Sequence, residues 1–155
     1  MEPVNTIHRP YRRPGAGDFA ALLSLLENCG LPTTDLTLAS LAHFRVARDG
    51  DRISAVAGLV ALGHVGLLRS VAVAPAQRGQ GLASGLVDTL EQEARRLGLT
   101  TLYLLTSSAG EFFGRRGYQV IPREEAPAAI RDSAEFTRLC PATALCMRKA
   151  LAAPP

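Results

Sequence analysis

A glycine-rich turn between an apolar strand and a long helix constrains this 155-residue chain more than any other feature. The turn lies within 71–84 and contains Gly79 and Gly81. Leucines at helical spacing from Leu82 onward predict that a helix begins there. The first N–H groups of a helix have no partner within it, and the helix dipole adds partial positive charge. The turn is therefore a candidate phosphate site, since glycines let an anion approach the backbone closely.

Two common phosphate-binding motifs do not fit this turn. A mononucleotide P-loop needs a lysine after its last glycine, but the only lysine in the chain is Lys149. A dinucleotide motif needs a third glycine, and Gly85 comes one place too late for it. The motif also needs an acidic residue at the end of the next strand, but that strand ends at Leu105-Thr106 without one. A glycine-rich strand-to-helix turn considered alone can also be purely structural.

The remaining elements are expected in an order typical of α+β domains, with antiparallel strands first and a strand-helix-strand unit in the middle. Asp49-Gly50-Asp51 between two apolar runs predicts a hairpin. The strands are predicted at 6–12, 43–48, 52–62, 65–73, 100–105, 118–121 and 143–148. Helices are predicted after a capping Asp18, at 34–41, 82–97 and 109–115, and in part of 124–139. The unit from 65 to 105 predicts one parallel crossover.

Charge and apolar patterning exclude several classes of protein. The net charge is +3, and the arginines are scattered among acidic residues without the basic stripe and interleaved aromatics of a nucleic-acid binder. The sequence contains no apolar run of about 18 residues, which a membrane span would need, and no signal peptide is expected. An odd number of cysteines, three, is typical of a reducing compartment, so we expect a cytoplasmic protein. The length suits a single domain.

Two landmarks resemble those of the GNAT superfamily of N-acetyltransferases. The run Arg78-Gly79-Gln80-Gly81-Leu82-Ala83 is similar to its pyrophosphate loop, Arg/Gln-x-x-Gly-x-Gly/Ala, and it follows the usual Val-x-Val-x-Pro strand end. The run 112–118 resembles the second landmark, aromatic-x-x-x-Gly-aromatic. The order of elements matches as well, so the resemblance covers nearly the whole chain. It implies one α+β GNAT domain over 1–155, with a mixed, mostly antiparallel sheet, a splayed parallel strand pair and flanking helices.

The resemblance implies acetyl-CoA as co-substrate and no metal. The pantetheine arm would bond the backbone of the splayed strand, and the pyrophosphate would lie on the turn. The expected cofactor-binding residues are Val71, Ala72, Val73, Arg78, Gly79, Gln80, Gly81, Leu82, Ala83 and Ser84. Cys140 and Cys146 are interpreted as buried thiols, since five residues separate them and no third soft ligand is near in the sequence.

Acetyl transfer needs a neutral amine, an oxyanion stabiliser and a proton for the departing thiolate. Many GNAT relatives carry a tyrosine donor four residues before the landmark glycine, where this chain has Phe113. Tyr118 follows that glycine, and we expect it to pack against the sheet. Glu111 is the candidate base and Ser107 the candidate proton donor, while a surface role is the alternative for Glu111. Water, Ser108, His64 or the substrate ammonium are further alternatives.

Arg69 interrupts an otherwise apolar strand. A charge there is costly unless paired, so the sequence leaves two interpretations open. Arg69 pairs with an acid on a neighbouring strand, or it grips an acceptor carboxylate or phosphinate. The runs 67–73, 104–109 and 134–141 resemble small GNAT proteins of arsenic-resistance operons and the glutamate-acetylating branch. That resemblance implies anion contacts from Arg69, Arg45 and Arg138, in falling order, with surface positions as the alternative for the last two.

The sequence therefore predicts an acetyl-CoA-dependent N-acetyltransferase that acts on the amine of a small anionic amino acid or glutamate analogue. Arsinothricin-like or phosphinothricin-like acceptors and a role in arsenic resistance follow from the resemblance. The alternatives are a protein N-terminal or lysine acetyltransferase and a non-catalytic acyl-CoA-binding regulator. The expected partner is a small-molecule amine, without nucleic acid or membrane, and a homodimer is a possible assembly.

Overall fold

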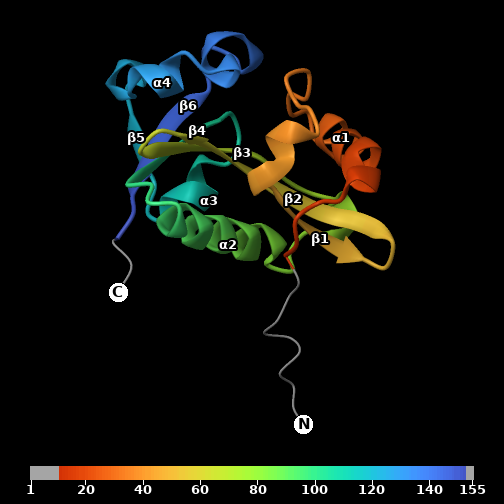
Figure 1. Cartoon of the computed structure of the whole chain (residues 1–155). Helices are drawn as coiled ribbons and strands as arrows, with labels where there is room; N and C mark the ends of the chain where they lie inside the picture. Colours follow the sequence, from red (N-terminus) through yellow and green to blue (C-terminus); the bar gives the residue numbers. More distant parts are fainter. Residues whose placement is uncertain (1–10, 153–155) are drawn as a thin grey trace. The chain divides into compact units, whose positions relative to one another are not determined.

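Residues 11–152 are described by a computed structural model, drawn in Figure 1. The sheet has six strands in the order β1-β2-β3-β4-β6-β5. The strands are β1 (Arg45–Asp49), β2 (Arg52–Leu62), β3 (Val65–Val73), β4 (Thr101–Thr106), β5 (Gln119–Ile121) and β6 (Leu145–Ala150). The α-helices are α1 (Phe19–Asn28), α2 (Leu82–Arg96), α3 (Gly110–Arg115) and α4 (Ala128–Arg131). β3 and β4 form the one parallel pair recorded, which confirms the predicted α+β class and crossover.

Short helical turns complete the described chain. They are η2 (Ala16–Asp18), η3 (Ala39–His43), η4 (Pro75–Gln77), η5 (Arg123–Glu125) and the π-helical turn η6 (Glu135–Leu139). The segment 124–139 is therefore partly helical and is interrupted at Pro127, as expected. Most of the strand predicted at 6–12 lies outside the described residues, and within them Arg12 forms an isolated bridge with Val46.

The helix predicted at 34–41 and the strand predicted from 43 were both placed too early in the chain, because the observed elements begin later. The helical turn is η3 at Ala39–His43, and bonds between Thr37 and Ser40 fix its start. Thr37 N–H donates to the Ser40 hydroxyl, that hydroxyl donates to the Thr37 carbonyl, and Ser40 N–H donates to Thr37 Oγ1. β1 consequently begins at Arg45. The last strand begins at Leu145 rather than 143, because Ala144 N–H donates to the Pro141 carbonyl and closes a turn.

Asp18 precedes α1 as predicted, but its side chain does not cap that helix. One of its carboxylate oxygens instead accepts a hydrogen bond from Gly15 N–H, 2.6 Å away, and pairs with Arg48. These two interactions lower the pKa of Asp18, the Gly15 bond contributing most. The prediction of a side-chain cap was therefore wrong, because Gly15 N–H and the Arg48 guanidinium bind the carboxylate in place of the first N–H groups of α1.

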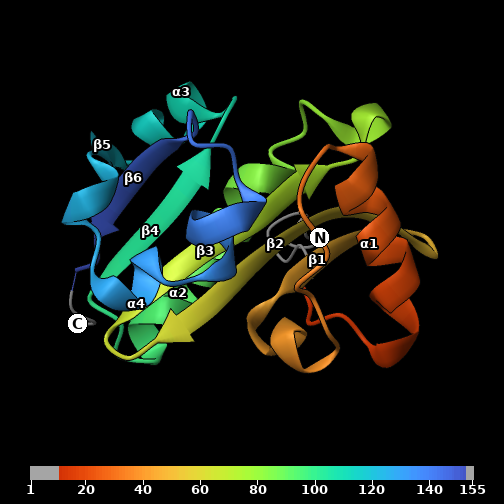
Figure 2. The same cartoon turned by 90° about the horizontal axis from the view of Figure 1, so that it is seen from above.

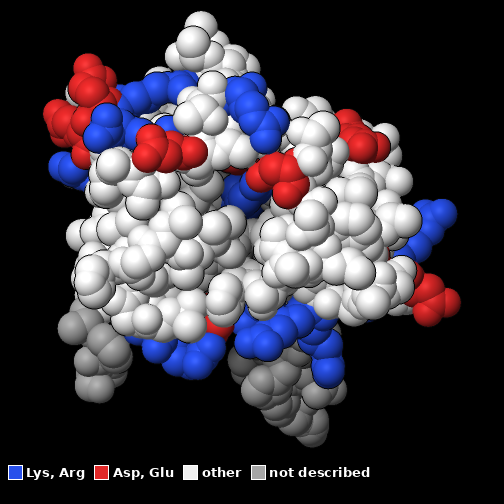
Figure 3. All heavy atoms as spheres, turned by 45° about the horizontal axis from the view of Figure 1, so that its top comes forward, with Lys and Arg blue, Asp and Glu red and all other residues white. Residues whose placement is uncertain are grey.

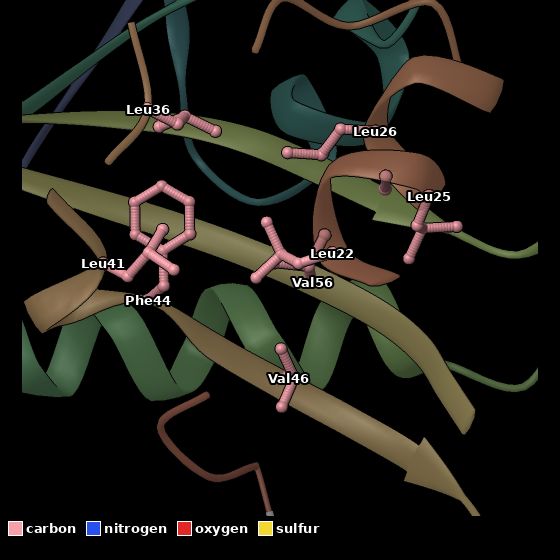
Figure 4. Packing of buried hydrophobic residues seen from close by; sticks show 9 residues of the cluster. Leu22, Leu25, Leu26, Leu36, Leu41, Phe44, Val46 and Val56 are labelled. Atoms are coloured by element: carbon pink, nitrogen blue, oxygen red, sulfur yellow. The ribbon is translucent and has the colours of Figure 1, made fainter. Parts of the chain in front are cut away.

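The first of two compact units contains the described residues up to Gly58 together with Ser70–Glu91. α1 and α2 lie on opposite faces of its strands (Figure 1). Leucines at helical spacing on α1 pack onto aromatic and β-branched residues, as Figure 4 shows. The buried cluster is Leu22, Leu25, Leu26, Leu36, Leu41, Phe44, Val46, Val56 and Ala72. Gly58 lets the Phe44 ring lie against the β2 backbone, since a Cβ there would be 2.4 Å from the ring.

The second unit contains Leu59–Arg69 and the described residues from Gln92 onward. β4 and β6 lie side by side within it and pair antiparallel over six positions, as Figure 2 shows from above. Its buried cluster is Leu67, Tyr103, Ile121, Ala126, Ile130 and Cys146. The parallel pairing of β3 with β4 covers only Val65–Leu67 against Thr101–Tyr103. β3 then continues through Ser70, whose φ of 57° is left-handed, which is uncommon for a residue with a side chain.

Candidate functional site

The strand-to-helix turn has the geometry that the sequence predicted. After β3 the chain makes the η4 turn and passes through Arg78–Gly81 before α2 begins at Leu82. Gly79 and Gly81 have φ values of 86° and 79°, a region that residues with a Cβ rarely adopt. A Cβ added at either glycine would meet nothing within 4 Å, so the space beside the backbone is open. The turn can therefore admit a ligand close to its backbone.

The backbone N–H groups of this turn are available to a ligand. The first bond of α2 runs from Gly85 N–H to the Gly81 carbonyl, at 3.0 Å. Among the described residues, no acceptor is recorded for the N–H groups of residues 79–84, and residues 78–81 are exposed. The 15-residue length of α2 gives a full helix dipole at this end. The donor set and the charge suit a pyrophosphate group, which is the polar group expected of acetyl-CoA.

Arg78 does not extend away from the turn. Its Nε donates to the Val73 carbonyl at 3.1 Å, and its Nη2 lies 3.8 Å from Cys29 Sγ. Cys29 Sγ lies 3.8 Å from the same carbonyl oxygen. Cys29 follows the last residue of α1. Its Sγ therefore links the end of that helix to the end of β3, at Val73, and to the start of the turn, at Arg78. Cys29 was not predicted as a site residue, because no local motif in the sequence marks it.

Arg69 is buried and paired with Glu135. Its Nη2 lies 3.4 Å from Glu135 Oε2, and the two side chains are 3% and 5% exposed. The partner comes from η6 and not from a neighbouring strand, so that part of the paired interpretation was wrong. The signal that predicted a carboxylate partner was the charge on an apolar strand, but nothing local indicated Glu135. A buried Arg–Glu pair can orient a guanidinium or simply neutralise it.

Cys140 lies close to the Arg69–Glu135 pair, and the three residues are called the Arg69–Glu135 cluster. Burial and then the Glu135 carboxylate raise the pKa of Cys140 to about 11, against the opposing effect of Arg69 and Arg123. Burial also raises the pKa of Cys146, which is 2% exposed. Both thiols are therefore protonated near neutral pH. The expectation of buried thiols is confirmed for Cys146 but was wrong for Cys140, which is only half-buried at the end of η6. Among the described residues, no group of three or more His, Cys, Asp or Glu side chains could hold a metal ion.

The other two predicted anion contacts differ from each other. Arg45 on β1 is 8% exposed, and its Nη1 donates to the Phe44 carbonyl at 2.9 Å, so it is not the surface residue of the alternative interpretation. Arg138 is exposed on η6, in the same turn as Glu135. Their contacts with an acceptor stay predictions.

The predicted catalytic groups lie around the start of α3. Ser107 and Glu111 are exposed, and Thr106 Oγ1 accepts a hydrogen bond from Ala109 N–H at 2.9 Å, which fixes the turn between β4 and α3. Solvent reaches both groups, so either can exchange protons with water. No recorded contact joins Ser107 to Glu111, and their catalytic roles stay predictions.

The aromatic landmark is a packed cluster. Phe113 and Tyr118 are 5% and 3% exposed, with their rings edge to face at 5.5 Å between centroids. Lys149 Nζ lies 5.5 Å from the centroid of the Tyr118 ring. Tyr118 is thus packed, as expected of the aromatic after the landmark glycine. His64 has a backbone role in its turn, where its carbonyl accepts from Thr100 N–H at 2.7 Å.

On the face drawn in Figure 3, acidic and basic side chains lie together over the segment that carries α4. Basic side chains also gather along the lower edge of this view, and much of the remaining face carries neither sign. A search of the described residues finds no helix with both the length and the apolar character needed to cross a membrane.

Comparison with known proteins gives relatives along most of the chain. The profile of the Acetyltransferase (GNAT) family matches residues 27–118. An amino-acid acetyltransferase of Pseudomonas aeruginosa is 31% identical over 135 residues, which are 82% of this chain and 31% of that protein. The chain thus spans about a third of the length of such relatives. An amino-acid acetyltransferase of Mycobacterium tuberculosis is 34% identical over 131 residues, covering 78% of this chain and 74% of the relative.

Solved structures share the fold. N-acetylglutamate synthase from Neisseria gonorrhoeae, complexed with coenzyme A and N-acetyl-glutamate, aligns with a TM-score of 0.79 at 21% identity over 91% of this chain and 34% of that one. Rv2747 from Mycobacterium tuberculosis, in complex with CoA and NLQ, aligns with a TM-score of 0.76 at 27% identity, over 91% of this chain and 98% of that one. The family profile covers more than half of the chain, and its strand-turn-helix landmark has the expected geometry. The chain therefore belongs to the acetyltransferase (GNAT) family.

Proposed function

We propose that this chain is an acetyl-CoA-dependent N-acetyltransferase whose acceptor is an amino acid. The observation that carries the proposal is the row of N–H groups at 79–84, for which the described part of the chain offers no recorded acceptor, at the start of a 15-residue helix. The relatives named amino-acid acetyltransferases support the acceptor class, and the neighbouring structures that contain coenzyme A support the co-substrate. A single catalytic domain over 1–155 is part of the same proposal.

The turn would hold the pyrophosphate, and β3 would hold the pantetheine arm. The parallel pairing of β3 ends at Leu67, so the backbone of Val71–Val73 lies beyond the last recorded β4 pair. Ala74 N–H donates to the Ser54 carbonyl on β2. In an extended strand the backbone N–H and C=O groups of neighbouring residues point to opposite sides. Val73 therefore directs its backbone away from β2. Acetyl-CoA supplies an activated thioester, and the residues of this chain bind it and orient it toward the amine.

The acceptor amine must lose its proton before it attacks the acetyl carbonyl carbon. Glu111 and Ser107 are our candidates for moving that proton and for protonating the thiolate as the C–S bond breaks. Phe113 replaces the tyrosine that many relatives use, and CoA thiolate is a fairly good leaving group, so water can act as the acid. Holding the two substrates in line would supply much of the rate.

For the acceptor we propose a small anionic amino acid or glutamate analogue, including arsinothricin-like and phosphinothricin-like compounds. Arg69 is the leading contact for its anion, followed by Arg45 and Arg138. The support is chemical: a guanidinium at Arg69 held by Glu135 is oriented in a dry environment, where its bonds to a carboxylate would be strong. An arsenic-resistance role, a cytoplasmic location and a homodimer are further parts of the proposal.

The experiment that tests this proposal is a thiol-release assay with acetyl-CoA and a panel of acceptors. The panel contains glutamate, other amino acids, phosphinic and arsenic-bearing glutamate analogues, polyamines and peptides. We expect turnover with anionic amino acids and the highest kcat/KM for one of the glutamate analogues. Turnover only with peptides would favour a protein acetyltransferase, and acetyl-CoA binding without turnover on any acceptor would favour a regulator.

A further inference from the structure

The side chain of Arg78 folds back onto the strand that precedes its own turn. Its Nε donates to the Val73 carbonyl, five residues earlier, at 3.1 Å. The bond closes a ring over the η4 turn. The main chain of that turn bonds Gln77 N–H to the Ala74 carbonyl at 2.8 Å, whereas the bond from Arg78 N–H to the Pro75 carbonyl is long at 3.4 Å. The main chain therefore holds the turn itself well but holds Arg78, the residue that leads into the glycines, more weakly. The side-chain bond adds a constraint at that residue.

The acceptor in this bond is a carbonyl that β2 does not use. Ala74 N–H donates to the Ser54 carbonyl at 2.8 Å, so Ala74 faces β2. Val73 is its neighbour on the strand and directs its carbonyl to the other side. Cys29 Sγ, at 3.8 Å, is the other recorded donor to this oxygen and only a weak one. Arg78 is thus the principal recorded partner of a strand-end carbonyl.

The glycines that follow Arg78 make such a constraint valuable. Gly79 and Gly81 give the turn its left-handed conformation, but glycine loses more backbone entropy on ordering than any other residue. A turn that samples several conformations binds its ligand more weakly, in proportion to the fraction in the competent one. A second tether, from Gln77 Nε2 to Asp49 Oδ2 at 3.0 Å, holds the opposite side of η4.

We propose that Arg78 is a positioning residue for acetyl-CoA: by donating its Nε–H to the Val73 carbonyl it holds the turn so that the N–H groups of 79–84 converge on the phosphates. Its positive charge is not the property that the site uses. The inference rests on the proposed function, because it takes the turn as the pyrophosphate site. It names an indirect role where an arginine beside a phosphate site would ordinarily be assigned a direct ionic one.

The bonding atom makes the two roles separable. Nε of arginine and Nε2 of glutamine are both attached to Cδ, so glutamine can place a neutral N–H donor at the same point of the side chain. Lysine has a carbon at that point, so it keeps the charge but carries its N–H donors one atom further along the side chain. The indirect role therefore predicts that Arg78→Gln preserves binding and Arg78→Lys does not, and a direct ionic role predicts the reverse.

The test is the Kd of acetyl-CoA, measured by calorimetry at low and moderate salt, for wild type, Arg78→Gln, Arg78→Lys and Arg78→Met. Arg52→Met is the matched control, since Arg52 is another exposed arginine of the same unit. We expect Arg78→Gln to stay within about threefold of wild type, and the Lys and Met variants to bind about 5- to 30-fold more weakly. The loss should appear in the KM for acetyl-CoA, with acceptor KM unchanged, and melting temperatures report folding.

Tight binding by Arg78→Lys together with weak binding by Arg78→Gln would overturn the inference and assign a direct ionic contact. Wild-type affinity in all three variants would overturn it as well, because loss of the bond would then have no effect on acetyl-CoA binding. A wild-type protein that fails to bind acetyl-CoA would overturn the proposed function, and the inference with it. The wild-type measurement thus separates the two failures.

Discussion

The glycine-rich turn at 78–81 and the Arg69–Glu135 cluster hold their polar groups in opposite ways. The turn offers backbone N–H groups, and its special residues, Gly79 and Gly81, are two places apart in the sequence. The cluster uses two buried side chains that are 66 positions apart (135 − 69) and belong to β3 and η6. Backbone donors are fixed by local conformation, whereas the cluster exists only once distant segments have packed. The first region can therefore be recognised from a short motif, and the second cannot.

The largest expected effect concerns the cluster and would show whether it binds a ligand at all. Arg69→Ala alone would strand a buried carboxylate and destabilise the fold whatever its role, so the pair is better replaced as Arg69→Met with Glu135→Leu. If Arg69 grips the acceptor, acceptor kcat/KM should fall ~30- to 1,000-fold, equivalent to about 2–4 kcal/mol, with acetyl-CoA Kd nearly unchanged. Steady-state kinetics and calorimetry measure the two quantities.

The pair Arg96–Glu93, bidentate at 2.9 and 2.7 Å between an exposed guanidinium and a buried carboxylate, provides the matched control. The double variant Arg96→Met with Glu93→Leu should leave both constants within about twofold, because this pair belongs to neither the turn nor the Arg69–Glu135 cluster. An unchanged acceptor constant in the Arg69/Glu135 variant, with the protein folded, would make the buried pair purely structural.

The next effect concerns the turn. Gly81→Val should abolish the rise in melting temperature that acetyl-CoA produces, because a side chain would stand where phosphate oxygens approach the backbone. Gly81 has a φ of 79°, so valine there is strained in any case. Gly98→Val carries the same strain, at a φ of 82° and with open space around it, and should lower the melting temperature without removing the ligand shift. Equal ligand shifts in both variants would move the cofactor elsewhere.

A smaller effect is expected at the aromatic landmark. Tyr118→Phe should retain most of the turnover, within about tenfold, because its ring is packed against Phe113 and the loss of a hydroxyl leaves that packing intact. Phe113→Tyr should not be needed for turnover, so wild type, with Phe113, should already be active. A fall in kcat of two orders of magnitude or more for a folded Tyr118→Phe protein would identify Tyr118 as the catalytic acid.

The smallest effect is a pH dependence from Cys140. Its pKa in the folded protein is raised to about 11 from 9.0, so the unfolded chain loses this proton first. The stabilising contribution is complete below pH 9 and is lost as the pH rises toward 11. Melting temperature should therefore fall less between pH 9 and 11 in Cys140→Ser than in wild type, because serine does not titrate there. Identical slopes in the two proteins would contradict the assignment.

The hairpin, the long helix and the glycine-rich turn were determined by the sequence itself, because each depends on residues close together in the chain. β2 and β3 begin and end where the apolar runs predicted, and Gly50, at the tip of the predicted hairpin, has a φ of 64°. The parallel crossover also followed from sequence, since a strand, a helix and a strand in that order pack one way.

Only the tertiary structure decided which partner each buried charge acquired. The charge on β3 required a carboxylate, but Glu135 was one acid among fourteen, and its place depended on how η6 packed. The bond from Arg78 to Val73 was equally hidden, because a flexible side chain can point to solvent, to a ligand or back to its own strand. Backbone periodicity is a local property, whereas side-chain pairing is a property of the packed fold. The glycine-rich turn could therefore be predicted from the sequence, and the Arg69–Glu135 pairing could not.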